Sequence, residues 1–296
     1  MSAGELPRRQ YGRSGIVVSA LGLGAGQIGD PALDERVVLD LLDTARAGGV
    51  NLIDTAPSYG VSEERLGRLL AHRRGEFVLS TKLGYGVPGI EDWTGPCIAA
   101  GIDQALRRLQ IEKLDIAHLH SCPLHVLRRD DILQALEAAK AAGKVGAIAY
   151  SGENEALEFA LACGRFDGVM ASLNPFDQRV IDGTLPRLGG MGFFAKRPLA
   201  NAPWRFAERP HGDYCEAYWL RWRAMVLPDP GMAWGEFASR FAVWQEGVSS
   251  AVFGTGSPAH LRELLEWVGR GPLPAELVER WRGAFRERDD GWIGQI

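Results

Sequence analysis

The sequence predicts an α/β protein of the (β/α)8 TIM-barrel class, with an N-terminal β-hairpin and a long loop insertion before strand 8. The chain has 296 residues, which lies within the usual length of one such barrel. From about residue 20, short apolar runs alternate with amphipathic helical stretches, and eight such runs occur. Strands that alternate with helices pair in parallel through βαβ units, and closing eight units leaves no exposed sheet edge. An open, doubly wound sheet fits the same alternation.

The eight predicted strands are short apolar runs, each of which ends in a polar residue or a glycine. They cover residues 19–24, 50–54, 77–82, 114–120, 145–151, 167–174, 192–196 and 250–254. Helical patterns with apolar residues at three-to-four spacing lie between them, for example over residues 34–49 and 131–143. Both patterns end in Gly, which is the usual residue just past a helix C-terminus.

Two segments interrupt the alternation. Residues 6–18 predict a β-hairpin that turns at Ser14 and Gly15, ahead of the first barrel strand. Residues 201–232 are rich in Trp, Pro and Arg, and predict a long insertion before strand 8 with a helix at 213–225. Long loops that follow barrel strands commonly shape the substrate pocket. A last helix is expected at 275–287, and we expect residues 1–296 to form one barrel domain.

Composition excludes several classes of function. Hydrophobic residues make up 46% of the chain, but no apolar run approaches membrane-spanning length. The first ten residues lack the apolar core of a secretory signal, so we expect a cytoplasmic protein that does not bind membranes. The net charge is −4 and no Lys/Arg cluster is present, which argues against nucleic acid as a partner. The four cysteines are widely spaced and predict ordinary thiols.

Polar residues at the ends of predicted strands indicate chemistry. Asp54, Lys82 and His120 close the second, third and fourth strands, and Tyr59 follows Asp54 in the next loop. In a barrel, these strand ends meet at one mouth. A tyrosine is a poor acid at neutral pH, but a nearby ammonium stabilises its phenolate, and a carboxylate can hold that ammonium in place. An imidazole can donate a hydrogen bond to a carbonyl oxygen. Together the four side chains predict protonation of a carbonyl oxygen as hydride reaches the carbon.

Each of the four residues alone also has a purely structural interpretation. An Asp after a strand often caps a helix, a Lys there commonly extends to solvent, and a lone His or Tyr is often a packing residue. Only their occurrence together and in this order favours catalysis.

The same residues carry a resemblance to a known family. The stretch NLIDTAPSYG (51–60), the STK that ends at Lys82 and the LDIAHLH that ends at His120 resemble signatures of the aldo-keto reductase superfamily. The opening YGRSGIVVSALGLG (11–24) is similar to the start of that family. The resemblance runs from about residue 9 to about residue 268. It implies a (β/α)8 barrel, NADPH as the usual cofactor with NAD possible, and reversible reduction of an aldehyde, ketone or sugar carbonyl to an alcohol.

By position, the resemblance also implies roles for the four residues. Tyr59 would be the general acid, Lys82 would tune it, Asp54 would pair with Lys82, and His120 would orient the substrate carbonyl. The partner is then a small-molecule carbonyl compound or sugar. No feature of the sequence predicts an oligomeric state.

The resemblance further implies that later strand ends bind the cofactor. Ser151 and Asn174 would contact the nicotinamide carboxamide, although Gly152 stands where the family often has Asn, and the family's Gln before Asn174 is missing. Lys196 lies in AKRPL, where many members have AYSPL with a ring that stacks on nicotinamide; its ammonium would instead meet the pyrophosphate. A solvated basic pair with Arg197 is the alternative.

The segment after strand 8, GTGSPAHLRELL (254–265), predicts a phosphate site. Ser257 is a good helix N-cap and Pro258 a good first helical residue, so the helix would begin with free backbone amides that favour an anion. The resemblance places the adenosine 2′-phosphate here, with Arg262 as its partner; a capped helix with an exposed Arg is the alternative. The predicted cofactor-binding residues are Gly24, Ser151, Asn174, Lys196, Gly254, Thr255, Gly256, Ser257 and Arg262.

Other interpretations remain open at this point. Residues 24–29 match GxGxxG after a strand, which is typical of Rossmann dehydrogenases, but Asp30 and Pro31 interrupt the junction with the next helix. His118 and His120 form an HxH that suits a metal-dependent barrel hydrolase, yet the later strand ends supply no further ligands, and we expect no metal site. A cofactor-binding regulatory subunit with little turnover is a third possibility.

The substrate pocket is predicted only in outline. Trp93, after the third strand, and Trp204, in the insertion, are candidate lining residues, and each is also a candidate packing residue.

Overall fold

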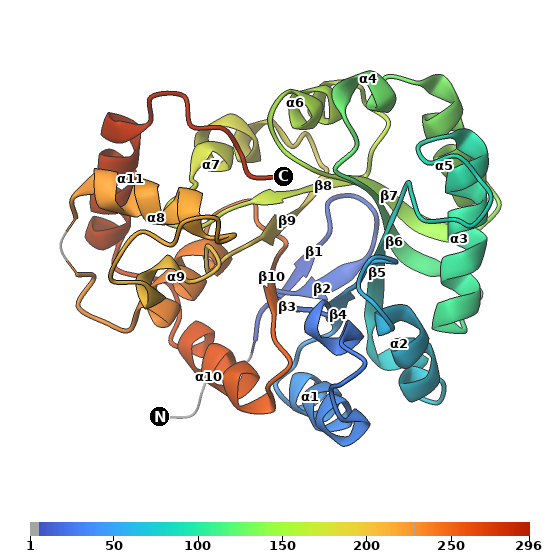
Figure 1. Ribbon diagram of the computed structural model, residues 1–296, viewed down its shortest axis with the longest axis horizontal. Helices are drawn as coiled ribbons and strands as arrows, with labels where there is room; N and C mark the ends of the chain where they lie inside the picture. The colour runs from blue at the N-terminus through green and yellow to red at the C-terminus, as the bar shows by residue number, and fades with distance from the viewer. Residues whose placement is uncertain (1–5, 228) are drawn as a thin grey trace.

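The computed structural model describes residues 6–227 and 229–296, which form a closed barrel of parallel strands surrounded by helices (Figure 1). Residues 1–5, half of the ten-residue stretch on which the expectation about a secretory signal depends, lie outside the described part. The eight strands follow one another around the barrel in chain order, and β10 closes it by pairing with β3. The barrel strands are β3 (Leu21–Gly24), β4 (Leu52–Asp54), β5 (Val78–Leu83), β6 (Leu114–His120), β7 (Val145–Ser151), β8 (Gly168–Ser172), β9 (Gly192–Lys196) and β10 (Ser250–Gly254).

The barrel confirms the predicted fold class and excludes the open sheet. Residues 21–24 of β3 pair in parallel with residues 251–254 of β10, so the sheet has no free edge. The same closure rules out a Rossmann domain built on residues 24–29.

The helices form the outer layer. They are α1 (Glu35–Ala47), α2 (Ser62–Leu70), α3 (Gly95–Leu109), α4 (Leu124–Leu127), α5 (Asp130–Ala141), α6 (Asn154–Ala162), α7 (Arg179–Gly183), α8 (Glu216–Met225), α9 (Trp234–Val243), α10 (Pro258–Gly269) and α11 (Ala275–Arg288). Short 3-10 helices span Gln27–Gly29, Arg74–Glu76, Leu185–Arg187 and Pro203–Arg205. Three of these helices begin at a residue type that commonly caps a helix N-terminus. The side chains of Asp34, Thr94 and Ser257 accept hydrogen bonds from backbone N–H groups at the starts of α1, α3 and α10.

The N-terminal hairpin is also confirmed, and it seals the amino end of the barrel. Strands β1 (Arg8–Gln10) and β2 (Val17–Ser19) pair antiparallel. Tyr11, in the turn between them, is fully buried, and its ring centroid lies 4.5 Å from that of Phe194 inside the barrel. A Cβ on Gly168 or Gly192 would come within 2.1 or 2.2 Å of Tyr11, so these two glycines make room for it. The open mouth is therefore at the opposite, carboxyl end.

The boundaries of the predicted elements are close to those observed. Strands β6, β7, β9 and β10 have the predicted limits, whereas β8 ends at Ser172 because the chain turns where Asn174 bridges to Asp177. The insertion before β10 contains α8, which starts at Glu216 rather than at residue 213. No helix in the described ranges is both long and apolar enough to cross a membrane.

Candidate active site

A pocket of about 760 Å³ opens at the carboxyl ends of the barrel strands. All four residues of the predicted catalytic set line it. They reach the same mouth from β4, the β4–α2 loop, β5 and β6, as the parallel barrel requires.

Asp54 and Lys82 form a buried ion pair on neighbouring strands. The Lys82 ammonium lies 2.5 Å from one Asp54 carboxylate oxygen, and the two side chains are only 3% and 5% exposed. Lys82 also donates to the Thr55 carbonyl at 2.8 Å, and the Ser80 hydroxyl donates to the other Asp54 oxygen at 2.8 Å. Burial on its own would lower the pKa of Lys82, but Asp54 and then Tyr59 raise it above its usual value. Lys82 is thus a fixed positive charge at neutral pH.

Tyr59 lies directly over this charge. The Lys82 ammonium is 4.9 Å from the centroid of the Tyr59 ring. The loop that carries Tyr59 packs closely on Gly29. A Cβ on Gly29 would come within 1.7 Å of the Tyr59 carbonyl oxygen, and the Val61 N–H donates to the Gly29 carbonyl at 3.1 Å. The last glycine of the GxGxxG match therefore serves close backbone packing beneath Tyr59, rather than the start of a helix.

His120 ends β6 and faces the pocket as a neutral imidazole. Burial, followed by the charges of Lys82 and Lys196, lowers the pKa of His120 to about 3. Its Nδ1 is hydrogen-bonded to the hydroxyl of Tyr85, which also contacts the Ser58 hydroxyl at 2.8 Å. The sequence interpretation missed Tyr85, whose signal is an aromatic residue between two glycines, three positions after Lys82.

Four of the predicted cofactor-binding residues line the same pocket: Gly24, Ser151, Lys196 and Gly254. The Ser151 hydroxyl is buried and has no hydrogen-bond partner within the described part of the chain. Gly24 and Gly254 face each other across β3 and β10, where a Cβ on Gly24 would come within 3.2 Å of the Gly254 backbone. The pocket thus has two glycines side by side on β3 and β10, and on β7 a buried hydroxyl without a partner among the described residues.

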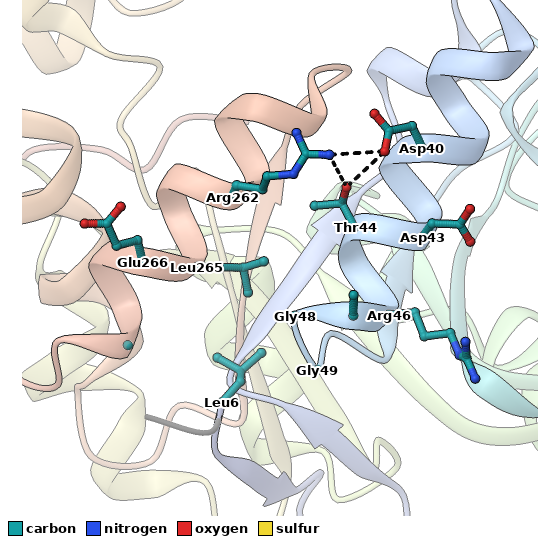
Figure 2. A pocket seen from close by; sticks show the side chains of 12 residues that line it. Leu6, Asp40, Asp43, Thr44, Arg46, Gly48, Gly49, Arg262, Leu265 and Glu266 are labelled. Carbon is teal, nitrogen blue, oxygen red and sulfur yellow. Dashed lines mark hydrogen bonds and ion pairs between the residues drawn. The ribbon is translucent and has the colours of Figure 1, made fainter. Parts of the chain in front are cut away.

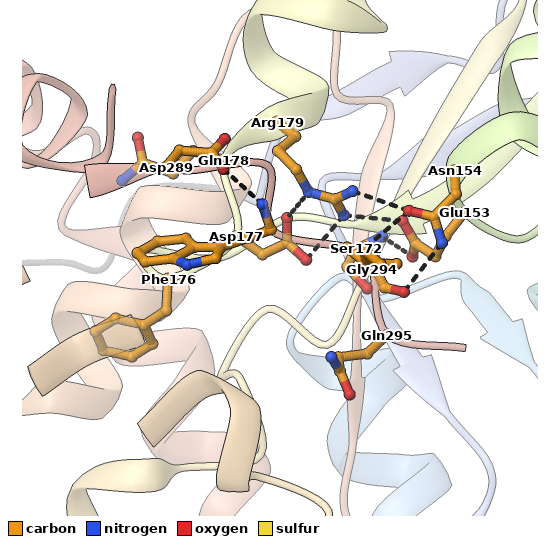
Figure 3. Close-up of polar contacts among 12 residues, drawn as sticks. Glu153, Asn154, Ser172, Phe176, Asp177, Gln178, Arg179, Asp289, Gly294 and Gln295 are labelled. Carbon is orange, nitrogen blue, oxygen red and sulfur yellow. Dashed lines mark hydrogen bonds and ion pairs between the residues drawn. The ribbon is translucent and has the colours of Figure 1, made fainter. Parts of the chain in front are cut away.

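Lys196 is held by an acid that the sequence interpretation did not identify. Its ammonium lies 3.4 Å from Glu153, whose side chain is 1% exposed. Burial, opposed by Glu153, lowers the pKa of Lys196. Glu153 also accepts the Ser172 N–H at 2.8 Å and lies 3.6 Å from Arg179, which pairs with Asp177 at 2.8 Å (Figure 3). The sequence feature that could have identified Glu153 is its position two residues after Ser151, where strand β7 ends.

The structure does not bring Asn174 to the pocket. Asn174 is fully buried; its amide donates to the Arg197 carbonyl at 3.1 Å and accepts the Phe176 N–H at 2.9 Å. These bonds close the turn after β8, and the buried side chain is not among those that line the pocket. The pocket lining therefore gives no support to Asn174 as a carboxamide contact, and in this structure its side chain holds the turn.

Arg262 is also placed elsewhere. It lines a separate pocket of about 770 Å³ between α1 and α10, where its guanidinium contacts Asp40 at 3.2 Å and Thr44 at 3.1 Å (Figure 2). The acidic side chain on α1 draws Arg262 to the flank of the barrel, away from the mouth. In the neighbouring turn, Thr255 accepts the Ser257 N–H at 3.0 Å, and Thr255, Gly256 and Ser257 lie beside the mouth pocket without lining it.

The two predicted pocket tryptophans contact other aromatic side chains. Trp204 stacks on Trp234 at 6.0 Å within an aromatic cluster that includes Phe176. The Trp93 ring covers Gly84 and lies 5.8 Å from the Tyr85 ring. Neither tryptophan lines the mouth pocket.

The hydrolase alternative gains no support from the geometry. His118 is fully buried inside the barrel, one layer below His120. Within residues 6–227 and 229–296, no three His, Cys, Asp or Glu side chains are grouped so that they could hold a metal ion.

The chain is similar to known reductases and dehydrogenases. A family model described as the aldo/keto reductase family matches residues 20–285. The chain is 32% identical over 312 residues to D-threo-aldose 1-dehydrogenase from a Pseudomonas species, which covers 90% of this chain and 95% of that protein. It is 32% identical over 154 residues to L-galactose dehydrogenase from Arabidopsis thaliana, spanning 49% of this chain and 48% of that one. The holo form of an aldo-keto reductase from Bacillus halodurans superposes with a TM-score of 0.80 at 24% identity, covering 94% of this chain and 96% of that one, so the two share the fold.

Proposed function

The chain belongs to the aldo/keto reductase family, and from that premise we propose that it reduces a sugar or other small carbonyl compound to an alcohol, reversibly, with NADPH and with Tyr59 as the proton donor. The observation that carries the proposal is the convergence of Asp54, Tyr59, Lys82 and His120 on one pocket.

The residues of the mouth fit a nicotinamide dinucleotide. Ser151 offers an unused buried hydroxyl for the carboxamide, and Gly24 and Gly254 line the same pocket without side chains that could obstruct a ring. Lys196 and Arg197 add positive charge on the same pocket wall, as a pyrophosphate requires. When bound there, the cofactor supplies hydride to the carbonyl carbon.

The protein's own part in the reaction is to control a proton. In reduction, the Tyr59 hydroxyl gives its proton to the carbonyl oxygen, and the fixed charge of Lys82 stabilises the phenolate that forms. Asp54 keeps the ammonium in place. The neutral His120 binds and orients the carbonyl oxygen, and in the reverse reaction the Tyr59 phenolate accepts the proton of the alcohol.

A sugar is the favoured substrate class. The relatives with full-length and half-length matches are named as aldose and galactose dehydrogenases, and the pocket is lined by polar groups from several strands. We further propose that residues 1–296 act as one barrel domain. The expected cytoplasmic location remains a prediction.

The test is titration with NADPH and NADH followed by turnover on a panel of aldoses, ketones and aldehydes. The expected result is saturable binding of NADPH, and oxidation of NADPH when a carbonyl compound is added. Binding without turnover on any of these compounds would favour a regulatory subunit, and failure to bind either nucleotide would contradict the proposal.

A further inference from the structure

Tyr85 is held rigidly beside the catalytic mouth. It lies between Gly84 and Gly86, whose φ angles of +128° and +74° favour glycine. The loop is pinned on both sides, because Trp93 donates to the Gly84 carbonyl at 2.7 Å and Gly86 donates to Asp92 at 2.9 Å. The Tyr85 hydroxyl therefore has a fixed position in the pocket wall.

This hydroxyl links two side chains from different loops. It is bonded on one side to Nδ1 of His120 and on the other to the hydroxyl of Ser58, 2.8 Å away. The rings of Tyr85 and His120 lie 5.6 Å apart at 33°. Since Nδ1 is occupied by this bond, Nε2 is the ring nitrogen left to face the pocket, which His120 lines.

The direction of the Tyr85–His120 bond follows from acidity. Buried beside Lys82, His120 is neutral at pH 7, so one ring nitrogen carries a proton and the other accepts. A phenol is a stronger acid than a neutral imidazole N–H, and an imidazole nitrogen is a stronger base than a phenol oxygen. The Tyr85 hydroxyl therefore donates its proton to Nδ1 of His120. Its oxygen accepts a hydrogen bond from the hydroxyl of Ser58, which is exposed and can also bond to water.

We propose that Tyr85 is a positioning residue that fixes His120 in the Nε2–H tautomer, so that this N–H points to the carbonyl oxygen of a bound substrate. The role of the N–H in turnover depends on the proposed function, whereas the tautomer is a property of the free protein. The opposite tautomer would aim a nitrogen lone pair at the carbonyl oxygen and repel it.

The direct test is ¹⁵N–¹H correlation NMR of histidine side chains near neutral pH, with the His120 signals assigned from a His120→Gln variant. The proposal predicts a protonated Nε2 and an unprotonated Nδ1 in the wild type. Tyr85→Phe keeps the ring and removes the hydroxyl, and it should shift both signals towards a mixture of tautomers. Tyr214→Phe is the control, because it removes a hydroxyl bonded to Arg197 on another part of the mouth, and it should leave His120 unchanged. A protonated Nδ1 in the wild type, or unchanged His120 signals in Tyr85→Phe, would overturn the proposal.

Kinetics supply the second readout. Loss of one directing hydrogen bond should lower kcat/KM for the carbonyl substrate about 10-fold in Tyr85→Phe, with NADPH affinity unchanged. In the His120→Gln background the same change should have little further effect, since Tyr85 acts only through the His120 imidazole, which this background lacks; additive losses would contradict the proposal. If a Tyr59→Phe variant kept full turnover, the proposed function would fail while the NMR result on the tautomer would still stand.

Discussion

At the scale of single residues, the site depends on a charge that is expensive to bury. Lys82 and Asp54 are both almost inaccessible to water, and removing either partner of such a pair typically costs about 3–5 kcal/mol because the other charge is left uncompensated. A buried ion pair that is this costly to break fits a catalytic role, in which Lys82 holds a permanent positive charge next to the Tyr59 ring.

Asp54→Asn should make turnover more sensitive to alkaline pH. The Asp54 carboxylate raises the pKa of Lys82, so its loss lowers that pKa and Lys82 deprotonates at a lower pH. The basic limb of the kcat/KM profile should then move to lower pH, measured on protein shown to be folded by circular dichroism.

Ser80→Ala is the matched control for this experiment. It removes a hydrogen bond to the other Asp54 oxygen but keeps the carboxylate, so the basic limb should stay in place. An unshifted limb in Asp54→Asn would show that Asp54 does not set the charge of Lys82.

The sequence allowed us to predict that Asp54, Tyr59, Lys82 and His120 share one pocket, because strand ends of one barrel meet at one mouth. Residues whose roles depend on side-chain direction were predicted less well. Asn174 follows a strand, but its side chain turns back to satisfy the Arg197 and Phe176 backbone, and Arg262 is drawn to Asp40 on α1. The Arg197 and Asp40 partners lie 23 and 222 residues away in the sequence, and partners so distant leave no local pattern.

At the scale of elements, the loop before α2 is shaped by close backbone contact. Gly29 ends the 3-10 helix after β3, and Gly60, with φ of +52°, approaches it so closely that a Cβ would meet the Gly29 carbonyl oxygen at 2.3 Å. This contact fixes the loop on which Tyr59 stands. The GxGxxG pattern alone did not predict it, because the pattern does not specify which backbone the glycine approaches.

Gly29→Ala should displace the Tyr59 loop. The added Cβ would lie 1.7 Å from the Tyr59 carbonyl oxygen, so the backbone must move. We expect a loss of about 1–3 kcal/mol in the free energy of unfolding, typical of overpacking, and a fall in kcat of more than 10-fold. Urea unfolding and steady-state kinetics would check both.

Gly75→Ala is the control for this substitution, since nothing lies within 4 Å of a Cβ there. Its stability and kcat should match the wild type. If Gly29→Ala behaved like Gly75→Ala, the packing of the Tyr59 loop on Gly29 would be refuted.

At the scale of the whole molecule, the closed barrel places neutral histidines in its interior. Burial, and then the charge of Lys82, lowers the pKa of His118 from 6.5 to about 3. Between these values the unfolded chain binds more protons than the folded barrel, so His118 makes the protein less stable as pH falls from about 6.5 towards 3.

His118→Gln should therefore make stability less dependent on pH. We expect the loss of unfolding free energy between about pH 7 and about pH 5 to be smaller in this variant than in the wild type, as measured by urea titration at both values. His72→Gln removes an exposed histidine and should keep the wild-type dependence. An equal dependence in His118→Gln and the wild type would contradict the assignment of a neutral, buried His118.

The central claim is that Tyr59 supplies the proton for carbonyl reduction. Its most direct test is single-turnover oxidation of bound NADPH by the best carbonyl substrate, compared between the wild type and Tyr59→Phe. The account predicts that Tyr59→Phe slows the step about 10²- to 10⁴-fold while NADPH affinity is unchanged, because only the proton donor is lost. A wild-type rate in Tyr59→Phe would contradict the account and assign the proton to another group.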